Sequence, residues 1–288
     1  MALLPPWLIL DPYLQAWLQE DIGRGDRSAQ GLQLTQRHQA VWIAKERGII
    51  AGLILAQRIF YLLDPANQFL PQVPEGEFAE KVQVIATLEG PGDSLLMGER
   101  VALNLAMRLS GIATSTRKYV EIIADLSTKL VDTRKTTPGL RILEKYAAQI
   151  GGAINHRMGL DDSVMIKDNH ILAAGGISQA IAQIRTSIPY PLTIEVETSN
   201  FSDINEAIAA KVDIIMLDNM SLEDMTRAVQ LIRREGPDIR IEASGNITLD
   251  NLRLVAKTGV DYISSSAPIT RSTWLDLSMR LQKNRQET

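Results

Sequence analysis

The chain has 288 residues, of which 45% are hydrophobic and 22% charged, and its formal net charge is −4 at pH 7. This length allows one large domain or two smaller ones, and the apolar fraction is ordinary for a soluble globular protein. The acidic balance argues against non-specific nucleic-acid binding, which needs a broad basic surface. The chain has no cysteine, so disulfides, thiolate metal sites and cysteine nucleophiles are excluded.

The opening residues, MALLPPWLIL, are apolar but are not expected to form a secretion signal. They lack a basic segment and are interrupted by Pro5 and Pro6, so we expect no signal peptide. No apolar run reaches the roughly 18 residues that a membrane span needs. We therefore expect a cytoplasmic protein that binds neither nucleic acid nor a membrane.

The first half of the chain predicts a mixture of helices and strands. Helical spacing of apolar residues, strict alternation, and glycine or proline pairs distinguish the helices, strands and turns. The expected elements are a helix over residues 1–25, a strand, turn and helix over 39–56, a strand over 81–90, a turn over 91–93 and a helix over 99–126. Gly111 is a candidate interruption of the last helix.

From residue 129 onward, short apolar runs alternate with segments of helical periodicity. This alternation predicts parallel strands joined by right-handed crossovers. The runs are residues 129–131, 164–166, 192–196, 213–217, 239–241 and 260–263. Six or seven strands can be counted, so the sheet is either an incomplete barrel or has a further strand near residues 151–154.

Each of these runs ends in polar residues, which are expected to meet on one face of a β/α barrel and to form its active site. The last two ends, EASGN and SSSAP, fall where such barrels bind phosphate. A doubly wound sheet fits less well. There is no GxGxxG after a first strand, and the polar ends are spread over the whole array rather than gathered at one switch point.

A cluster of basic residues lies within residues 131–171. Local positive charge on a net-negative protein indicates a specific anionic ligand. Together with the acidic strand ends, it suits a substrate that is anionic and carries a metal. The cluster comprises Arg134, Lys135, Arg141, Lys145, His156, Arg157 and Lys167.

The segment DTRKTTPGLRILEKYAAQIGGAINHRMGLDDSVMIKDNHI (132–171) resembles the central signature of the quinolinate phosphoribosyltransferase family. The resemblance covers nearly the whole chain, because other motifs of the family follow in its order and spacing. These are EDIGRGD (20–26), GERVALNLAMRLSGIAT (98–114), IEVET (194–198), IIMLDNM (214–220), EASGN (242–246) and VDYISSSAPIT (260–270).

The resemblance implies both a fold and an assembly. An N-terminal α/β sandwich domain is expected over residues 1–110 and an open, incomplete β/α barrel over 111–270. A C-terminal helix is expected over 271–288, packing back on the first domain. The family forms homodimers or larger homo-oligomers in which a neighbouring subunit's N-terminal domain completes the barrel site.

The resemblance also implies a reaction. Quinolinate takes the phosphoribosyl group of phosphoribosyl pyrophosphate with Mg²⁺ and loses carbon dioxide, giving nicotinate mononucleotide and pyrophosphate in de novo NAD biosynthesis. No organic cofactor is expected. No side chain needs to act as a nucleophile, because the pyridine nitrogen attacks the anomeric carbon while the protein supplies orientation and charge.

Quinolinate has two adjacent carboxylates, and the planar fork of arginine matches carboxylate geometry. By the resemblance, Arg134, His156, Arg157 and Lys167 grip the dicarboxylate, and Arg100 reaches in from the partner subunit. Arg141 and Lys145, on the expected helix after Pro138, are as consistent with a structural role as with the basic surface.

The expected catalytic residues are Lys135, Glu197 and Asp218. By the resemblance, Lys135 pairs with phosphate oxygens. The two acids hold the ribose hydroxyls or Mg²⁺, directly or through water, and stabilise positive charge at the anomeric carbon. Glu195 shares a strand face with Glu197, and it and Glu242 are candidate supporting residues.

The expected contacts to the 5′-phosphate are Ser244, Gly245, Asn246, Ser265 and Ser266. Here the chain departs from the family pattern, which has a second glycine at Asn246, a glycine near Ser266 and a histidine at Arg271. Serine and arginine keep hydrogen-bond donors and charge, so phosphate binding is still expected, with altered contacts.

Three other functions are compatible with parts of this pattern. One is a sister enzyme that acts on nicotinate, although a monocarboxylate needs fewer cations. Another is a relative of the same fold associated with molybdenum transport operons. The third is a non-catalytic binding protein, against which the intact acids Glu197 and Asp218 argue.

Overall fold

The structure is a computed structural model that describes residues 3–282. Two compact units can be recognised in it. Unit 1 comprises the described parts of Met1–Arg117, Ile142–Gly152 and Arg271–Thr288, and unit 2 comprises Lys118–Arg141 and Ala153–Thr270. Unit 1 is therefore built from three stretches of chain, whereas the sequence suggested residues 1–110 with residues 271–288 packing back on them.

Unit 1 is organised around a four-stranded antiparallel sheet in the order β12-β1-β5-β3. Its strands are β1 (Arg37–Ala44), β3 (Gln68–Pro71), β5 (Val84–Pro91) and β12 (Leu277–Leu281), with a separate pair β2 (Gly48–Ile49) and β4 (Phe78–Ala79). Its helices are α1 (Trp7–Ile22), α2 (Arg27–Leu32), α3 (Leu53–Leu63), α4 (Gly92–Ile122) and α5 (Arg141–Ile150). The last residues of α4 and the first residue of α5 belong to unit 2.

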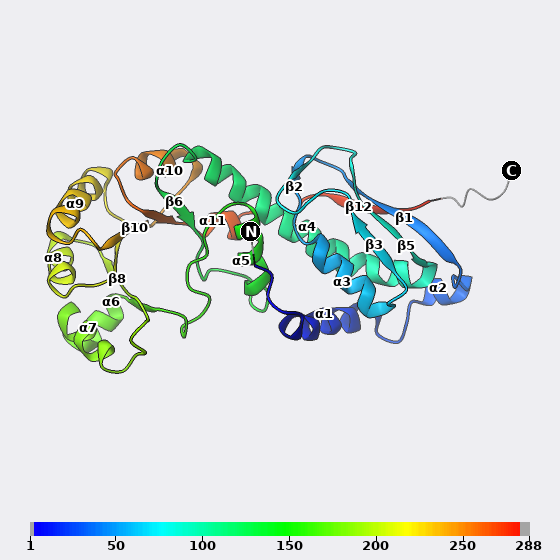
Figure 1. Ribbon diagram of the computed structural model, residues 1–288, viewed down its shortest axis with the longest axis horizontal. Coiled ribbons are helices and arrows are strands. Elements are labelled where there is room, and N and C mark those ends of the chain that lie inside the picture. The colour runs from blue at the N-terminus through cyan, green and yellow to red at the C-terminus, as the bar shows by residue number, and fades with distance from the viewer. Residues whose placement is uncertain (1–2, 283–288) are drawn as a thin grey trace. The chain divides into compact units, whose positions relative to one another are not determined.

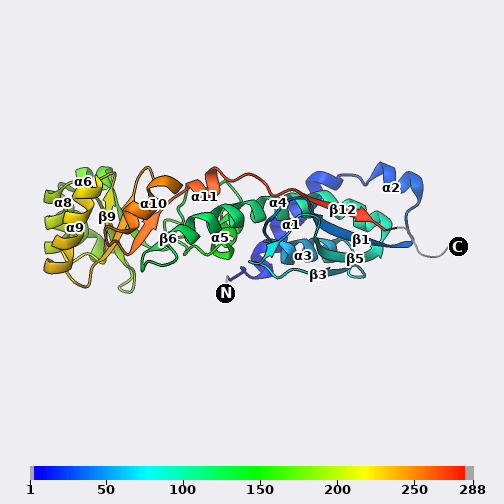
Figure 2. The same cartoon turned by 90° about the horizontal axis from the view of Figure 1, so that it is seen from above.

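An aromatic cluster forms the core of unit 1. Alternation along β1 buries Trp42, whose ring lies edge-on to Phe69 and Phe60 with centroids 5.2 and 6.3 Å apart. Phe60 comes from α3 and Phe69 from β3, so the cluster joins a helix to the sheet. Such edge-to-face pairs add about 0.5–1.5 kcal/mol beyond the area that they bury. Figure 2 shows α1 and α3 beside β3 and β5, as the α/β sandwich requires.

Helix α4 begins earlier than its sequence suggests. Gly92 and Asp93, expected in a turn, form its first residues, and Asp93 places a carboxylate in the first turn, where the helix dipole favours it. Gly111 does not interrupt the helix. A Cβ atom there would overlap the carbonyl oxygen of Thr273, so this glycine allows the returning chain to pass close to the helix.

The expectation of a C-terminal helix is wrong for residues 277–281. They form β12, which pairs antiparallel with β1 in a register that sets Met279 opposite Trp42. The free edge of β1 accepts the main-chain hydrogen bonds of this segment, and tertiary pairing of this kind overrides weak local preference. The segment does return to unit 1. Residues 283–288, part of the same prediction, lie outside the described residues.

Unit 2 contains a six-stranded parallel sheet in the order β6-β11-β10-β9-β8-β7. Its strands are β6 (Lys129–Val131), β7 (Val164–Ile166), β8 (Ile194–Thr198), β9 (Ile214–Asp218), β10 (Arg240–Ser244) and β11 (Tyr262–Ser264). Its helices are α6 (Asp168–Ala174), α7 (Ile177–Arg185), α8 (Phe201–Ala209), α9 (Leu222–Glu235), α10 (Leu249–Ala256) and α11 (Ala267–Thr270). The sheet is an open barrel, as expected.

The two faces of this sheet differ in chemistry. Figure 1 shows α7, α8, α9 and α10 along its outer face. The residues of the strands that alternate toward these helices are apolar and almost completely buried: Ile166, Val196, Ile215, Leu217, Ile241, Ala243 and Ile263. The other face, here called the inner face, carries the polar residues of the same strands.

The strand suspected near residues 151–154 is present only as an isolated parallel bridge between Val131 and Ile154. This bridge lies beside β6 and extends the inner face by one short contact. Within residues 3–282, no helix combines the length and apolar character that crossing a membrane requires.

Candidate active site

Strand alternation places the expected catalytic acids on the inner face of unit 2. Glu197 pairs in register with Met216, so Asp218, two residues further along β9, points to the same side. Asp218 in turn pairs with Ser244 at the end of β10. Three expected site residues therefore follow one another across three neighbouring strands, at the ends where barrel enzymes bind substrate.

Lys167 and Glu197, expected to contact different substrates, lie side by side. Lys167 follows the last residue of β7, and its Nζ lies 2.8 Å from Glu197 Oε2. The lysine side chain is half exposed, so the pair contributes little to stability. The ion pair holds both side chains at the edge of the inner face, where a bound ligand can replace either partner of the pair.

Asp132 anchors the segment that carries His156. This buried carboxylate accepts hydrogen bonds from Asn155 Nδ2 at 2.7 Å and from the backbone N–H of His156 at 2.8 Å. Asp132 follows β6 directly. The first residue of the loop after β6 therefore holds the main chain at residues 155–156 in place. A carboxylate that accepts from both a side chain and the main chain holds such a turn firmly.

The His156 ring faces two buried glutamates. Its Nε2 lies 3.0 Å from Glu195 Oε2 and 3.5 Å from Glu242 Oε2, and its Nδ1 accepts the backbone N–H of Arg157 at 2.8 Å. Both glutamates are at most 3% exposed. Their roles were only suspected from sequence, and the usable signal was that strand alternation places Glu195 and Glu242 on the inner face.

Burial is the main cause that raises the pKa of Glu242, to about 7. The negative charge of Glu195 adds to this, while His156 and a hydrogen bond from Ser264 act in the opposite direction. The ligating atoms of His156, Glu195 and Glu242 lie within 4.8 Å of one another, a spacing that could also hold a metal ion. The cluster is distinct from the metal ligands expected at Glu197 and Asp218.

Two of the expected quinolinate-binding arginines influence each other. Burial lowers the pKa of Arg157, and the positive charge of Arg134 lowers it further, while Glu195 and Asp162 raise it. Arg157 Nη1 donates to the carbonyl oxygen of Ser163 at 2.9 Å. Among the residues that the structure describes, Arg134 Nε is buried without a hydrogen-bond partner. Two guanidinium groups thus lie close together, and the Nε–H of Arg134 is available to donate to a ligand.

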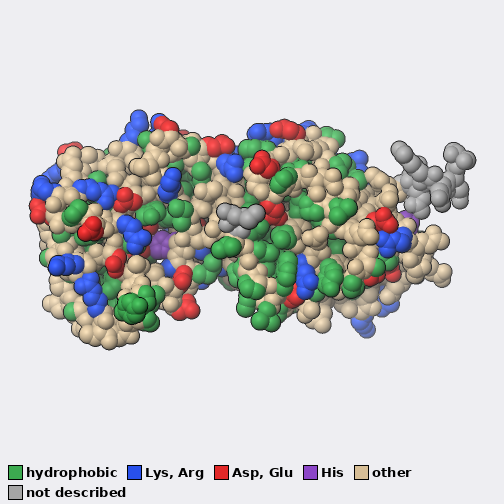
Figure 3. Space-filling model, in the orientation of Figure 1, with side chains coloured by type: hydrophobic (Ala, Val, Ile, Leu, Met, Phe, Trp, Pro, Cys, Tyr) green, Lys and Arg blue, Asp and Glu red, His purple; other side chains and the backbone are tan. Residues whose placement is uncertain are grey.

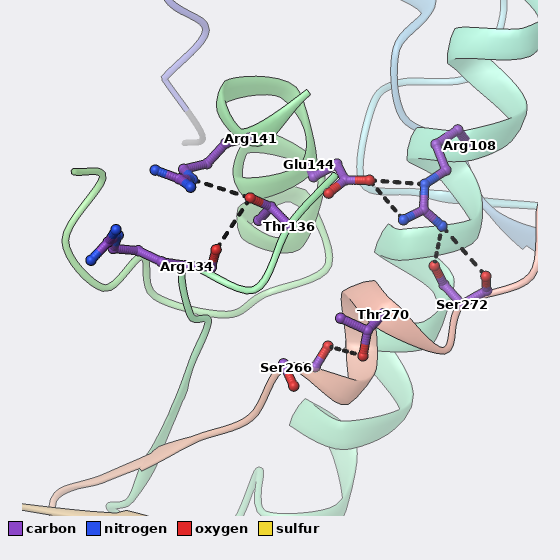
Figure 4. A network of polar contacts seen from close by, with 8 residues as sticks. All are labelled: Arg108, Arg134, Thr136, Arg141, Glu144, Ser266, Thr270 and Ser272. Carbon is purple, nitrogen blue, oxygen red and sulfur yellow. Dashed lines mark hydrogen bonds and ion pairs between the residues drawn. The ribbon is translucent and has the colours of Figure 1, made fainter. Parts of the chain in front are cut away.

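Arg141 contacts both of the loops that carry these two arginines, and Figure 4 shows its contact with Thr136 in the loop of Arg134. Its Nε donates to the hydroxyl of Thr136 at 3.1 Å, and its Nη1 donates to the carbonyl oxygen of Met158 at 3.2 Å. The backbone N–H of Lys135 donates to the Thr133 hydroxyl at 3.1 Å within the same loop, and the Lys135 side chain is exposed.

Lys145 of the basic cluster and Arg100, expected to act from a partner subunit, lie outside unit 2. Lys145 is completely buried within α5, in a stretch that belongs to unit 1. Arg100 lies on α4 in unit 1, where its side chain is 58% exposed and 3.9 Å from Glu99. Figure 4 also shows Arg108 of unit 1 paired with Glu144 at 2.7 Å and with Ser272, which is a structural network.

The loops after β9 and β10 have left-handed turns that bring them together. Asn219, Gly245 and Asn246 all have positive φ. Asn219 donates its backbone N–H to the carbonyl oxygen of Ser244 at 3.0 Å, and Asn246 Nδ2 donates to Asn219 Oδ1 at 3.1 Å. Gly245 has no room for a side chain, because a Cβ would overlap the Asn219 amide. Ser244, Gly245 and Asn246 thus form a fixed turn before α10.

The serines after β11 surround the start of the short helix α11. Ser265 is buried, and its hydroxyl accepts the backbone N–H of Ala267 at 3.3 Å. Ser266 is partly exposed, and its carbonyl oxygen accepts the Thr270 hydroxyl at 3.0 Å, as Figure 4 shows. The hydroxyl of Ser265 therefore accepts from the local turn, whereas Ser266 is more exposed.

Two family models match the chain, one for each part of it. The quinolinate phosphoribosyl transferase N-terminal domain matches residues 26–110, and the C-terminal domain of the same family matches residues 112–280. The chain belongs to the quinolinate phosphoribosyltransferase family.

Similar proteins of this family cover almost the whole chain. A probable carboxylating nicotinate-nucleotide pyrophosphorylase of Synechocystis is 63% identical over 99% of this chain and 96% of its own length. A human protein named carboxylating nicotinate-nucleotide pyrophosphorylase is 37% identical over 98% of this chain and 94% of its own length. NadC from Streptococcus pyogenes has a TM-score of 0.92 at 41% identity, covering 96% of this chain and 98% of that one.

Proposed function

We propose that the protein is a decarboxylating quinolinate phosphoribosyltransferase. It transfers the phosphoribosyl group of phosphoribosyl pyrophosphate to quinolinate, releases pyrophosphate and carbon dioxide, and forms nicotinate mononucleotide for NAD biosynthesis. Family membership over both parts of the chain and the names of its relatives support this activity. The cytoplasmic location expected from the sequence stays a prediction.

The observation that carries the proposal is the pair of neighbouring guanidiniums, Arg134 and Arg157. Arg134 keeps a buried, unpaired Nε–H among the described residues, and the proximity of Arg134 lowers the pKa of Arg157. Like charges held together in a partly buried site need an anionic partner. Two adjacent carboxylates on one ring supply two anionic partners, because each carboxylate can accept hydrogen bonds from one planar guanidinium group. Lys167 lies at the same inner face and is proposed to make a further contact with a quinolinate carboxylate.

In the proposed mechanism the protein positions the substrates and supplies charge. The pyridine nitrogen attacks the anomeric carbon as pyrophosphate leaves, and positive charge develops on the ribose ring. Glu197 and Asp218, fixed on neighbouring strands, stabilise that charge without moving. Lys135, exposed in the loop after β6, is proposed to pair with oxygens of the pyrophosphate that leaves.

The second chemical step is loss of the carboxylate next to the ring nitrogen. Once the nitrogen bears the ribose, its positive charge stabilises the electron pair that the departing carbon dioxide leaves on the ring. That electron pair then takes a proton to give nicotinate mononucleotide. The arginines hold the ring in one orientation, which removes much of the entropic barrier to the first step.

The acids at the strand ends fit a divalent metal. Glu197 and Asp218 point to one face from adjacent strands, and each has one oxygen bound to a protein donor, Lys167 or Asn219. Mg²⁺ commonly takes one or two carboxylates and completes its shell with substrate phosphates and water. We propose that these acids hold Mg²⁺, directly or through water. The ion, when bound, neutralises the charge of the phosphates.

The turn formed by Ser244, Gly245 and Asn246 is the proposed site for the 5′-phosphate, with Ser266 nearby along the chain. Positive φ values turn main-chain N–H groups outward in such loops, which suits an anion. Ser265 is proposed to contribute its hydroxyl, which accepts from Ala267 and can still donate its own hydrogen to a phosphate oxygen, whereas its main-chain N–H is bonded to the carbonyl oxygen of Val131.

We propose that the protein works as a homodimer or larger homo-oligomer in which Arg100 of one subunit serves the site of another. The Arg100 side chain is exposed, and among the described residues it pairs only with Glu99, at 3.9 Å, so it can reach a neighbouring molecule. Figure 3 shows hydrophobic side chains gathered on one face of unit 1. Exposed apolar residues of unit 1 include Leu8, Ile9, Tyr13, Ile54, Tyr61 and Leu70. Contiguous patches of this kind mark association surfaces.

The decisive experiment is product analysis with phosphoribosyl pyrophosphate and Mg²⁺, offering quinolinate and nicotinate separately. Nicotinate mononucleotide with an equal amount of carbon dioxide, formed from quinolinate alone, is the expected result. Turnover of nicotinate instead would move the protein to the sister activity. Binding of quinolinate without turnover would contradict catalysis and favour a binding protein.

A further inference from the structure

The two arginines proposed to grip quinolinate lie on separate loops. Arg134 is in the loop after β6, and Arg157 follows the bridge residue Ile154. The chain between them runs through residues 142–152, which belong to unit 1 rather than unit 2. The spacing of the arginines is therefore not set by a short covalent connection within unit 2, and non-covalent contacts must fix it.

Arg141 makes a direct link between these loops. Its Nε donates to Thr136 Oγ1 at 3.1 Å, and Thr136 Oγ1 donates to the carbonyl oxygen of Arg134 at 3.4 Å. On the other side, its Nη1 donates to the carbonyl oxygen of Met158 at 3.2 Å, next to Arg157. The contacts therefore reach the main chain of Arg134 itself and of the residue that follows Arg157.

The link opposes a repulsion within the site. Burial lowers the pKa of Arg157 most, and the like charge of Arg134 lowers it further, so the two guanidiniums disfavour each other. Without a bound anion the two loops gain by moving apart. Within residues 3–282, Arg141 forms no ion pair, and its Nε and Nη1 donate to uncharged oxygens. Figure 4 shows the guanidinium ends of Arg134 and Arg141 extending to the same side of the loop.

We propose that Arg141 is a positioning residue that sets the distance between Arg134 and Arg157 and so tunes the site for two adjacent carboxylates. The inference rests on the proposed function, because it needs quinolinate as the ligand. The planar guanidinium presents donors in fixed directions and can span two acceptors, whereas the single ammonium of lysine cannot reproduce that geometry.

The test compares Arg141→Lys with the wild type in steady-state kinetics, with each substrate varied in turn. The KM for quinolinate is expected to rise about tenfold, while kcat and the KM for phosphoribosyl pyrophosphate stay within about twofold, because charge-assisted hydrogen bonds that orient only one substrate are lost. The affinity for benzene-1,2-dicarboxylate, an unreactive probe with the same adjacent carboxylates, is expected to fall by the same factor in calorimetry.

A second pair of variants isolates the Thr136 hydroxyl. Thr136→Val removes the hydroxyl at nearly constant volume and is expected to shift the same parameter in the same direction, whereas Thr136→Ser keeps the hydroxyl and restores the wild-type value. Arg227→Lys is the matched control, because Arg227 is an exposed arginine of α9 that pairs with Asp224. It is expected to change neither KM.

An unchanged quinolinate KM in Arg141→Lys and Thr136→Val, with wild-type melting temperatures, would overturn the inference. Equal losses toward both substrates would also overturn it, since they would indicate general damage to the fold. If the wild type itself makes no nicotinate mononucleotide, the proposed function fails. The calorimetric arm then still reports whether Arg141 tunes binding of an adjacent dicarboxylate.

Discussion

His156 Nε2 lies 3.0 Å from Glu195 Oε2 at the inner face of the sheet, and Glu242 approaches the same nitrogen at 3.5 Å. One imidazole therefore stands between two buried carboxylates that repel each other. Among the described residues, Glu195 Oε1 and Glu242 Oε1 have no hydrogen-bond partner. Such an arrangement costs stability and is kept where a site needs it.

This cluster predicts how stability depends on pH. In the folded protein burial and Glu195 raise the pKa of Glu242 from 4.5 to about 7, against the smaller effects of His156 and Ser264. Between these values the folded state keeps a proton that the unfolded state has lost. Stability attributable to Glu242 is therefore present below pH 4.5 and falls as the pH rises toward about 7.

Glu242→Gln is expected to remove this dependence, because glutamine has no proton to lose. Melting temperatures measured across that range should fall with pH more gently in the variant than in the wild type. Parallel curves for the two proteins would contradict the assignment to Glu242.

Arg134→Ala is expected to abolish measurable quinolinate binding while leaving the fold intact. Removing one partner of a buried charge contact typically costs about 2–5 kcal/mol, or roughly 30-fold to several-thousand-fold in affinity. Calorimetry gives the affinity, and a melting curve separates lost binding from unfolding. A variant that melts normally and binds quinolinate as the wild type does would remove Arg134 from the site.

Mixed subunits test whether the site is shared. Arg100→Ala and Arg134→Ala proteins, each inactive alone, are expected to regain part of the activity when they are dissociated and reassembled together. Some of the mixed assemblies then hold one site with both arginines intact. Heterodimers verified by mass spectrometry that show no recovery would argue against a contribution of Arg100 from a neighbour.

Gly245→Ala tests the turn after β10. The residue has φ +99°, and a Cβ would lie 3.0 Å from the backbone nitrogen of Asn219 and closer still to its amide group. We expect the KM for phosphoribosyl pyrophosphate to rise about tenfold, because strain of about 1–3 kcal/mol displaces the turn. Gly175→Ala is the control for backbone strain alone, since Gly175 has φ +89° and no atom near its missing Cβ. Equal effects of the two substitutions would exclude steric overlap as the cause.

The strands and helices of the barrel could be located closely from sequence, because the pattern of apolar and polar residues within each short segment identifies them. The expected runs at residues 129–131 and 164–166 coincide with β6 and β7, because parallel strands between helices are short apolar segments with polar ends. In contrast, β12 has only five residues with mixed polarity, and its partner β1 lies far away in the sequence. No local pattern could reveal that pairing.

The candidate site likewise has features that local sequence predicts and features that it does not. Residue type and alternation were enough to place Glu197 and Asp218 on the inner face. The contacts of His156 with Glu195 and Glu242 join a loop to two strands, so they depend on how the sheet curves. The link from Arg141 to Thr136 and Met158 likewise depends on loop geometry, which residue spacing does not encode.

The pairing of Ala40 with Leu281 in the first sheet has a consequence for synthesis. Translation produces β1 early, but the strand that covers its outer edge emerges only after the entire barrel has been made. Until then the nascent chain carries an open strand edge, the kind of surface that pairs wrongly with other chains. The barrel can form before the first sheet has its last strand, so the sheet of unit 1 can be completed only after residues 277–281 have been made.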